Sequence, residues 1–168
     1  MRKVARPTRR ELARVLKQID QAFSGAKYPG DDGIVTDNSR SNLECAEVAT
    51  AFRGRHWSEI PLETLAYENQ ALFFFTPEAY RFYLPAYLKG MVSHYDELDA
   101  AVAATLFSLT RPPYLKDRRD YLQRIEIFTV PQRKAIISSL QWLNEHHAED
   151  FPLGDITKAL KSLQGCSN

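Results

Sequence analysis

An apolar, aromatic segment at residues 71–92 constrains the fold of this chain more than any other feature. Within it, Thr76-Pro77-Glu78 predicts a helix start, because threonine caps, proline presets the first turn and glutamate suits the positive end of the helix dipole. Pro85 has no N–H to donate to the carbonyl of Arg81, so we expect a kink or a break near Leu84. The residues that keep helical spacing across this point are Tyr80, Tyr83, Leu84, Tyr87 and Met91.

The same segment is expected in a protein core and not in a membrane. It is long enough to cross a bilayer, but Glu78, Arg81, Lys89 and two prolines are all costly in hydrocarbon. The N-terminus is basic, and charged residues continue through Arg14 where a secretory signal needs an apolar run. We therefore expect a cytoplasmic protein with no membrane partner.

The chain has the size and charge of one ordinary globular domain. Its 168 residues are enough to bury roughly 70% of the surface that the unfolded chain exposes. The 22 Lys and Arg against 21 Asp and Glu leave a net charge of +1, which is not the strongly basic charge typical of nucleic-acid-binding domains. Cys45 and Cys166 match neither a metal motif nor a disulfide framework. We expect a single domain over residues 1–168, with reduced thiols, Cys45 in the core and residues 1–7 flexible.

The remaining helix signals predict an all-α fold, a single compact domain of about seven or eight helices. Thr8-Arg9-Arg10-Glu11 is a capping box, and apolar residues at helical spacing continue to Phe23. Ser41-Asn42-Leu43-Glu44 is a second capping box, and Pro61 suits the first turn of a short helix. Further helices are expected after Asp96 as far as Leu109, from about Asp117, from Thr129 to about His147, and from a cap at Asp155 to Gly165.

Two segments stand outside this helical pattern. Residues 24–40 are rich in Gly, Pro, Asp, Asn and Ser, which favour turns, so they predict one long acidic loop centred on Tyr28–Gly33. Asp31 and Asp32 in that loop form an acidic turn or a cation site, although the spacing of a calcium loop is missing. Residues 71–75 are short and apolar enough for a buried strand, but the sequence supplies no evident partner strand.

No residue pattern identifies catalytic, nucleotide or metal chemistry. His146 and His147 are adjacent and therefore point about 100° apart on a helix, which does not suit joint metal ligation. The segment His94–Asp99 concentrates one imidazole and three carboxylates, but Asp96 and Asp99 are also what the start of the following helix should carry. We expect no cofactor, no metal and no catalytic residue.

Three stretches of the sequence carry a resemblance to a protein family. They are Tyr28–Asp32, Phe52–Trp57 and Phe75–Leu88, which read YPGDD, FRGRHW and FTPEAYRFYLPAYL. Over about residues 23–92 they resemble the pattern of an uncharacterised bacterial family of small proteins. The resemblance implies a grouping, and it brings no known activity, cofactor or catalytic residue.

The resemblance also suggests one surface formed by the acidic loop, the turn after Phe52 and the proline-containing helix. In it, Asp31 or Asp32 would pair with Arg53 or Arg55, for binding or for structure alone. Our leading hypothesis is a non-enzymatic protein-binding module of the bacterial cytoplasm, of the immunity or regulatory partner type. Its candidate binding residues are Asp31, Asp32, Arg53, Arg55, Trp57, Glu78, Arg81, Tyr83 and Tyr87.

Two other function classes stay open. A nucleic-acid-binding protein would use the basic face of the first helix, with Arg9, Arg10, Arg14 and Lys17. A small enzyme or ligand-binding protein needs a pocket with convergent polar groups. That pocket would collect Asp31, Asp32, Glu78, Arg81, Tyr83 and His56. The aromatic residues that form either core or a binding groove are Phe73, Phe74, Phe75, Tyr80, Phe82, Tyr83 and Tyr87.

Overall fold

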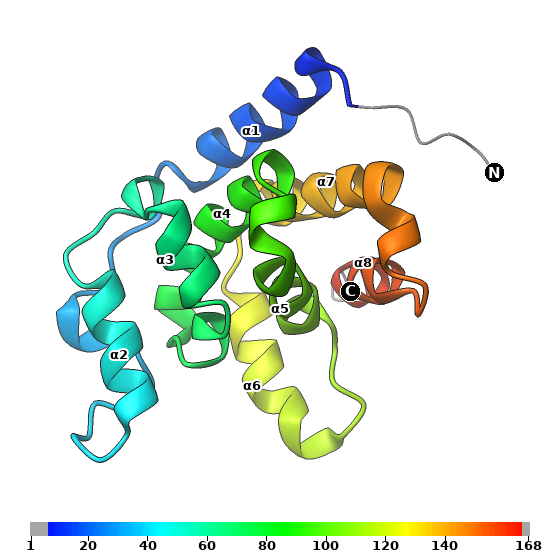
Figure 1. Cartoon of the computed structure of the whole chain (residues 1–168). Helices are drawn as coiled ribbons and strands as arrows, with labels where there is room; N and C mark the ends of the chain where they lie inside the picture. Colours follow the sequence, from blue (N-terminus) through cyan, green and yellow to red (C-terminus); the bar gives the residue numbers. More distant parts are fainter. Residues whose placement is uncertain (1–6, 166–168) are drawn as a thin grey trace.

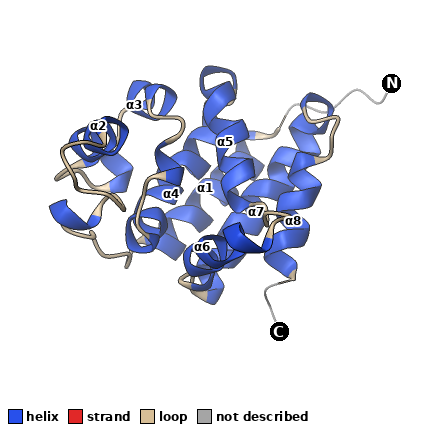
Figure 2. Cartoon of the chain, turned by 90° about the horizontal axis from the view of Figure 1, so that it is seen from below, coloured by secondary structure: helices blue, strands red, loops and turns tan. Residues whose placement is uncertain are grey.

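The computed structural model describes residues 7–165, and over that range the chain is built from helices (Figures 1 and 2). Eight α-helices occur among these residues and no β-strand does, so the all-α prediction is confirmed. The expected flexibility of residues 1–7 concerns, apart from Pro7, a segment outside the described residues, and so does Cys166. The helices are α1 (Arg9–Phe23), α2 (Leu43–Phe52), α3 (Leu62–Tyr67), α4 (Pro77–Ser93), α5 (Asp99–Leu109), α6 (Leu115–Glu126), α7 (Val130–His147) and α8 (Asp155–Gln164).

Helix α4 forms the centre of the fold. Almost every residue from Ala79 to Val92 is buried, and the helix contacts α1, α3, α5, α6 and α7. The helix is continuous from Pro77 to Ser93, so of the kink or break expected near Leu84 the break does not occur. Burial of apolar side chains on all sides stabilises both halves of the helix, which offsets the hydrogen bond that proline removes.

The other helices surround α4. Helix α1 packs across α4 and α7, α7 packs on α8, and α8 packs on α5 (Figure 1). Cys45 on α2 is buried in the core, as expected. No helix within residues 7–165 is both long enough and apolar enough to span a membrane.

Local capping chemistry accounts for several helix starts. Thr8 and Thr129 complete capping boxes at α1 and α7, and Thr76 caps α4. Helix α2 is capped by Asn42, whose Oδ1 accepts a hydrogen bond from the Cys45 backbone N–H at 3.1 Å, so the predicted capping box at Ser41 is wrong.

The acidic residues expected at the starts of α5 and α8 lie there, but they do not cap these helices. Asp99 is in the first turn of α5, which follows the 3₁₀ turn Asp96–Leu98 and has no side-chain cap. Helix α8 begins with Asp155 inside its first turn, and the residue before it is Gly154 with a left-handed φ of 73°. The carboxylate of Asp155 still lies at the positive end of the helix dipole, where it is favoured.

The long loop is tied to the start of α4 by backbone hydrogen bonds. The Thr36 N–H donates to the Phe74 carbonyl at 2.9 Å, and the Thr76 N–H donates to the Ile34 carbonyl at 3.0 Å. The Thr76 hydroxyl donates to the Gly33 carbonyl at 2.5 Å. Thr76 therefore caps α4 and holds the loop at the same time.

Residues 71–75, which the sequence leaves open as a short buried strand, do not form one. Ala71–Phe73 forms a 3₁₀ turn, and only Phe75 makes a β-bridge, with Val35 of the loop. Both residues of that bridge are buried. The apolar run therefore reflects burial beside the loop and not a strand in a sheet.

The double role of Thr76 predicts a specific effect of Thr76→Val. The variant loses the cap and the hydrogen bond to the loop, so we expect the free energy of unfolding to fall by about 2 kcal/mol. Thr129→Val removes a cap that holds no loop, and we expect a loss of about 1 kcal/mol. Urea unfolding measures both values.

Hydrogen exchange distinguishes this role from ordinary capping. In Thr76→Val the amides of residues 31–36 should exchange faster than in the wild-type protein, and in Thr129→Val they should not. Equal exchange of the loop in both variants would show that Thr76 does not hold it.

Burial of Tyr80 predicts a loss of stability at alkaline pH. Its hydroxyl lies 2.9 Å from Ser108 Oγ, and burial raises the pKa of Tyr80 from 10.0 to about 12. Because the folded protein keeps this proton to a higher pH than the unfolded chain, Tyr80 makes the free energy of unfolding fall as pH rises from 10 to 12. Tyr80→Phe should be less stable by about 1 kcal/mol at pH 8, and this difference should shrink by about the same amount at pH 11. Urea unfolding of both proteins at the two pH values is the measurement, and an unchanged difference would contradict the prediction.

Candidate functional site

The structure brings together two of the predicted site residues, Asp31 and Arg53. Arg53 Nε lies 3.9 Å from Asp31 Oδ2, and about half of each side chain is exposed, so the ion pair contributes little to stability. Asp31 also accepts a hydrogen bond of 2.5 Å from the Tyr28 hydroxyl. Asp32 and Arg55 are exposed. The expected pairing of the loop with the turn after α2 is therefore present.

Tyr28 connects that ion pair to the backbone of the turn. Its hydroxyl accepts a hydrogen bond of 2.8 Å from the Gly54 N–H, where a left-handed φ of 68° favours glycine. Burial, followed by the hydrogen bond to Asp31, raises the pKa of Tyr28. The ring packs edge-on against Phe82 at 5.6 Å. Tyr28 was not among the predicted site residues, although it begins the YPGDD stretch.

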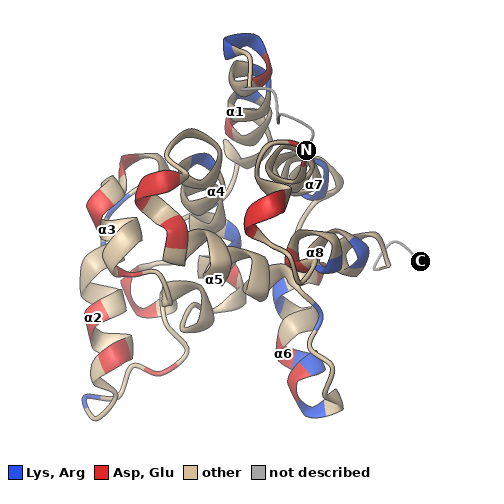
Figure 3. Ribbon diagram, turned by 45° about the vertical axis from the view of Figure 1, so that its right-hand side comes forward, with Lys and Arg blue, Asp and Glu red and all other residues tan. Residues whose placement is uncertain are grey.

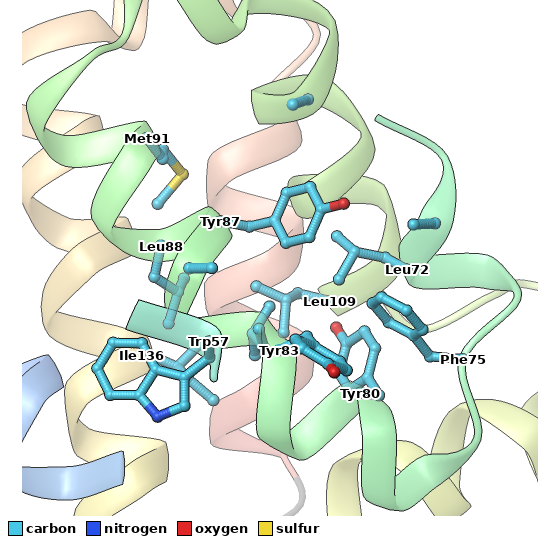
Figure 4. Packing of buried hydrophobic residues seen from close by; sticks show 14 of the residues in the cluster. Trp57, Leu72, Phe75, Tyr80, Tyr83, Tyr87, Leu88, Met91, Leu109 and Ile136 are labelled. Carbon is cyan, nitrogen blue, oxygen red and sulfur yellow. The ribbon is translucent and has the colours of Figure 1, made fainter. Parts of the chain in front are cut away.

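The predicted tyrosines of α4, Tyr83 and Tyr87, are buried (Figure 4). Their hydroxyls bind backbone carbonyls. Tyr83 donates to the Phe52 carbonyl at 2.8 Å and lies 3.2 Å from the Arg55 carbonyl, while Tyr87 donates to the Glu68 carbonyl at 2.7 Å. Burial raises the pKa of both hydroxyls. These two side chains therefore join α4 to the ends of α2 and α3.

Trp57 is also buried, with 4% of its surface exposed. Its indole ring lies under the ammonium group of Lys89, which is 5.6 Å from the ring centroid. A side chain this deeply buried contributes mainly to packing. His56, beside it, hydrogen-bonds through Nδ1 with Ser58 and packs edge-on against Phe82.

Glu78 and Arg81 lie together on α4. Arg81 Nε donates to Gln132 Oε1 at 2.9 Å, and Glu78 is exposed. Both line a hollow of about 380 Å³ with Lys27, and its lining does not include Asp31 or Asp32. The predicted pocket residues are therefore divided between this hollow and the ion pair of the loop.

Most of the aromatic series forms core. Phe75, Tyr80, Phe82, Tyr83 and Tyr87 are buried. Phe73 and Phe74 are partly exposed: Phe74 packs against the core, and Phe73 reaches a different surface, on α5.

A groove along α5 is an apolar hollow that sequence reasoning missed. Its volume is about 610 Å³. Phe107, with 72% of its surface exposed, stands in it and packs against Phe73 at 5.7 Å between ring centroids. We call it the α5 groove. Its lining comprises Gln70, Phe73, Ala100, Ala103, Ala104, Leu106, Phe107, Thr110, Phe151, Asp155 and Lys158.

One sequence signal could have found this groove. Helix α5 is apolar on more than one side, since Ala101, Val102 and Leu109 face the core while Ala100, Ala103 and Phe107 do not. A helix that is apolar all round is either fully buried or presents a second apolar face for another contact. The second stripe has the spacing i, i+3, i+7.

The histidine clusters have structural partners. His147 stacks on Tyr95 at 3.6 Å between ring centroids, and its Nδ1 lies 3.4 Å from Asp150 Oδ2. His94 hydrogen-bonds with Ser93. Within residues 7–165 no three His, Cys, Asp or Glu side chains are arranged to hold a metal ion.

The contacts of the loop predict different effects for Tyr28→Phe and Arg53→Gln. The first variant removes a hydrogen bond to a backbone N–H and should lower the free energy of unfolding by about 1 kcal/mol. The second removes an exposed ion pair and should change it by less than about 0.5 kcal/mol. Urea unfolding compares them, and a larger loss in Arg53→Gln would contradict this assignment of roles.

Residues 11–162 match the model of a family of unknown function, DUF6714, so the chain belongs to that family. The matched range extends beyond residues 23–92 on both sides and includes α5 and α6. No curated protein and no solved structure matches the chain. Membership agrees with the expectation of an uncharacterised family, and it assigns no activity.

Proposed function

We propose that this member of a family of unknown function is a non-enzymatic protein-binding module that regulates or neutralises another protein. The α5 groove is its docking surface, and the occupant is an amphipathic helix of the partner protein. The observation that carries the proposal is the exposure of Phe107 beside an apolar hollow. Large exposed apolar side chains grouped around a hollow are typical of interaction sites.

The shape of the groove favours a helix. Ala100, Ala103 and Ala104 form its floor, and alanines let the backbone of a second helix approach closely. From Ala100 to Phe107 the floor extends about 10 Å, which is two helical turns. Phe73 and Phe151 form part of its lining and offer apolar contacts to the side chains of an incoming helix.

The charges of the groove favour an apolar helix face. Asp155 and Lys158, which line it, pair with each other at 3.2 Å, so neither needs a charged partner. Helix α5 carries no charged residue after Asp99 (Figure 3). An unpaired charge entering this groove would be desolvated without compensation.

The surface first expected from sequence is less suited to docking. Tyr83, Tyr87 and Trp57 are buried, and the exposed pair of Asp31 and Arg53 is engaged within the chain. The alternative of an enzyme or ligand pocket needs these groups in one cavity, and the hollow beside Glu78 does not contain the loop carboxylates.

A photo-crosslinker tests the proposal. p-Benzoylphenylalanine at position 107 should capture one other protein in cells of the native host, whereas the same group at Tyr67, which is 79% exposed on α3, should not. Ala103→Glu should lower the yield at position 107 by about tenfold, because the carboxylate would be desolvated in the interface.

The matched control is Ala13→Glu, which places the same charge at an exposed alanine of α1 and should leave the yield unchanged. Mass spectrometry identifies the adduct. Capture at Tyr67 as strong as at position 107, or only of a second copy of this chain, would contradict the proposed function.

A further inference from the structure

Helix α6 extends from the body of the molecule (Figures 1 and 3). Of its twelve residues only Tyr121 and Ile125 are buried. It packs on α4 and, with fewer contacts, on α5. One face of α6 borders a second cavity, which shares Phe73, Phe107 and Thr110 with the α5 groove.

That second cavity has a volume of about 570 Å³ and lies between α6 and the end of α5. Its apolar lining is Phe73, Phe75, Pro77, Phe107, Pro112 and Pro113. Four charged side chains also line it, and they are Arg111, Asp117, Asp120 and Arg124. Within the described residues none of these four side chains makes an ion pair or a side-chain hydrogen bond.

Unpaired charges of both signs beside an apolar floor indicate a partner that also carries both signs. On α6 the two carboxylates, Asp117 and Asp120, lie in the first half of the helix, and Arg124 lies in the last turn. All three belong to one face, at spacings i, i+3 and i+7. The face is acidic at one end and basic at the other.

A face with this charge order is complementary to itself. When two such helices pack antiparallel about a two-fold axis, the acidic half of each lies opposite the basic end of the other. We propose that a second copy of this chain covers the cavity in this way, with Asp117 and Asp120 of each copy facing Arg124 of the other. This goes beyond the proposed function, because the charged residues of the α6 face carry it, although the cavity shares Phe73 and Phe107 with the α5 groove.

The position of Arg124 supports this pairing. Its guanidinium lies over the Tyr80 ring, 5.5 Å from the centroid, and its Nε is buried with no hydrogen-bond partner. Stacking holds the group in place, so a carboxylate can bind it with little loss of side-chain entropy. Arg124 is partly exposed, so a carboxylate of a second copy can reach the part of the guanidinium that faces solvent.

Charge reversal tests the dimer by sedimentation equilibrium over a range of protein concentrations. The wild-type protein should dimerise reversibly. Arg124→Glu, and separately the double variant Asp117→Lys with Asp120→Lys, should raise the dimer dissociation constant at least about tenfold. The matched control is Arg119→Glu, which makes the same charge change at an exposed residue of α6 outside the cavity and should change the constant by less than about twofold.

Mixing the two reversed variants gives the sharpest result. The double lysine variant carries only basic residues at the four charged positions of the cavity, and Arg124→Glu carries an excess of acidic ones. An equimolar mixture should therefore form a heterodimer, although neither variant dimerises alone. Recovery on mixing also shows that both variants are folded. A wild-type protein that stays monomeric, a mixture that does not associate, or an equal effect of Arg119→Glu would overturn the proposal.

The outcome is separable from the test of the proposed function. If the wild-type protein is monomeric and benzoylphenylalanine at position 107 still captures another protein, only the dimer is overturned. If the dimer forms and the crosslinker captures only a second copy, the dimer stands and the proposed function fails.

Discussion

The fold depends on how the tyrosines of α4 bury their hydroxyl groups. A buried hydroxyl without a partner is costly, and so is a backbone carbonyl at the end of a helix. Tyr83 and Tyr87 satisfy both needs, because they donate to carbonyls at the ends of α2 and α3. The central helix is thereby joined by directional bonds, as well as by packing, to the segments that surround it.

This arrangement gives the acidic loop and the turn after α2 a structural role. Thr76 and Tyr28 hold the loop at its two sides, and Asp31 is engaged by Tyr28 and Arg53. The exposed apolar side chains and the unpaired charges that a partner could cover lie elsewhere. They are the apolar stripe of α5, which includes Phe107, and the unpaired charges of the α6 face.

The sequence predicts those features that depend on local chemistry. Thr8 and Thr129 predict helix starts, because a capping side chain and the backbone N–H that it binds lie within one turn of each other. The α5 groove depends on which neighbours leave Ala103 and Phe107 uncovered, and no local pattern determines that. The sequence leaves the segment before α4 open as a short strand, because a short apolar run does not distinguish burial beside a loop from pairing in a sheet. The link between Asp31 and Arg53 was expected from neighbouring motifs, whereas Tyr28, which ties them to the backbone, was missed.

The central claim is that α4 stabilises the fold while α5 binds the partner protein. Two variants measured in parallel test this claim most directly. For each we would determine the free energy of unfolding and the crosslinking yield from position 107. Tyr83→Phe should lose about 1–2 kcal/mol of stability and keep its yield under conditions where it is folded. Ala103→Glu should keep its stability and lose its yield. Loss of the yield in Tyr83→Phe, with the yield retained in Ala103→Glu, would contradict the claim.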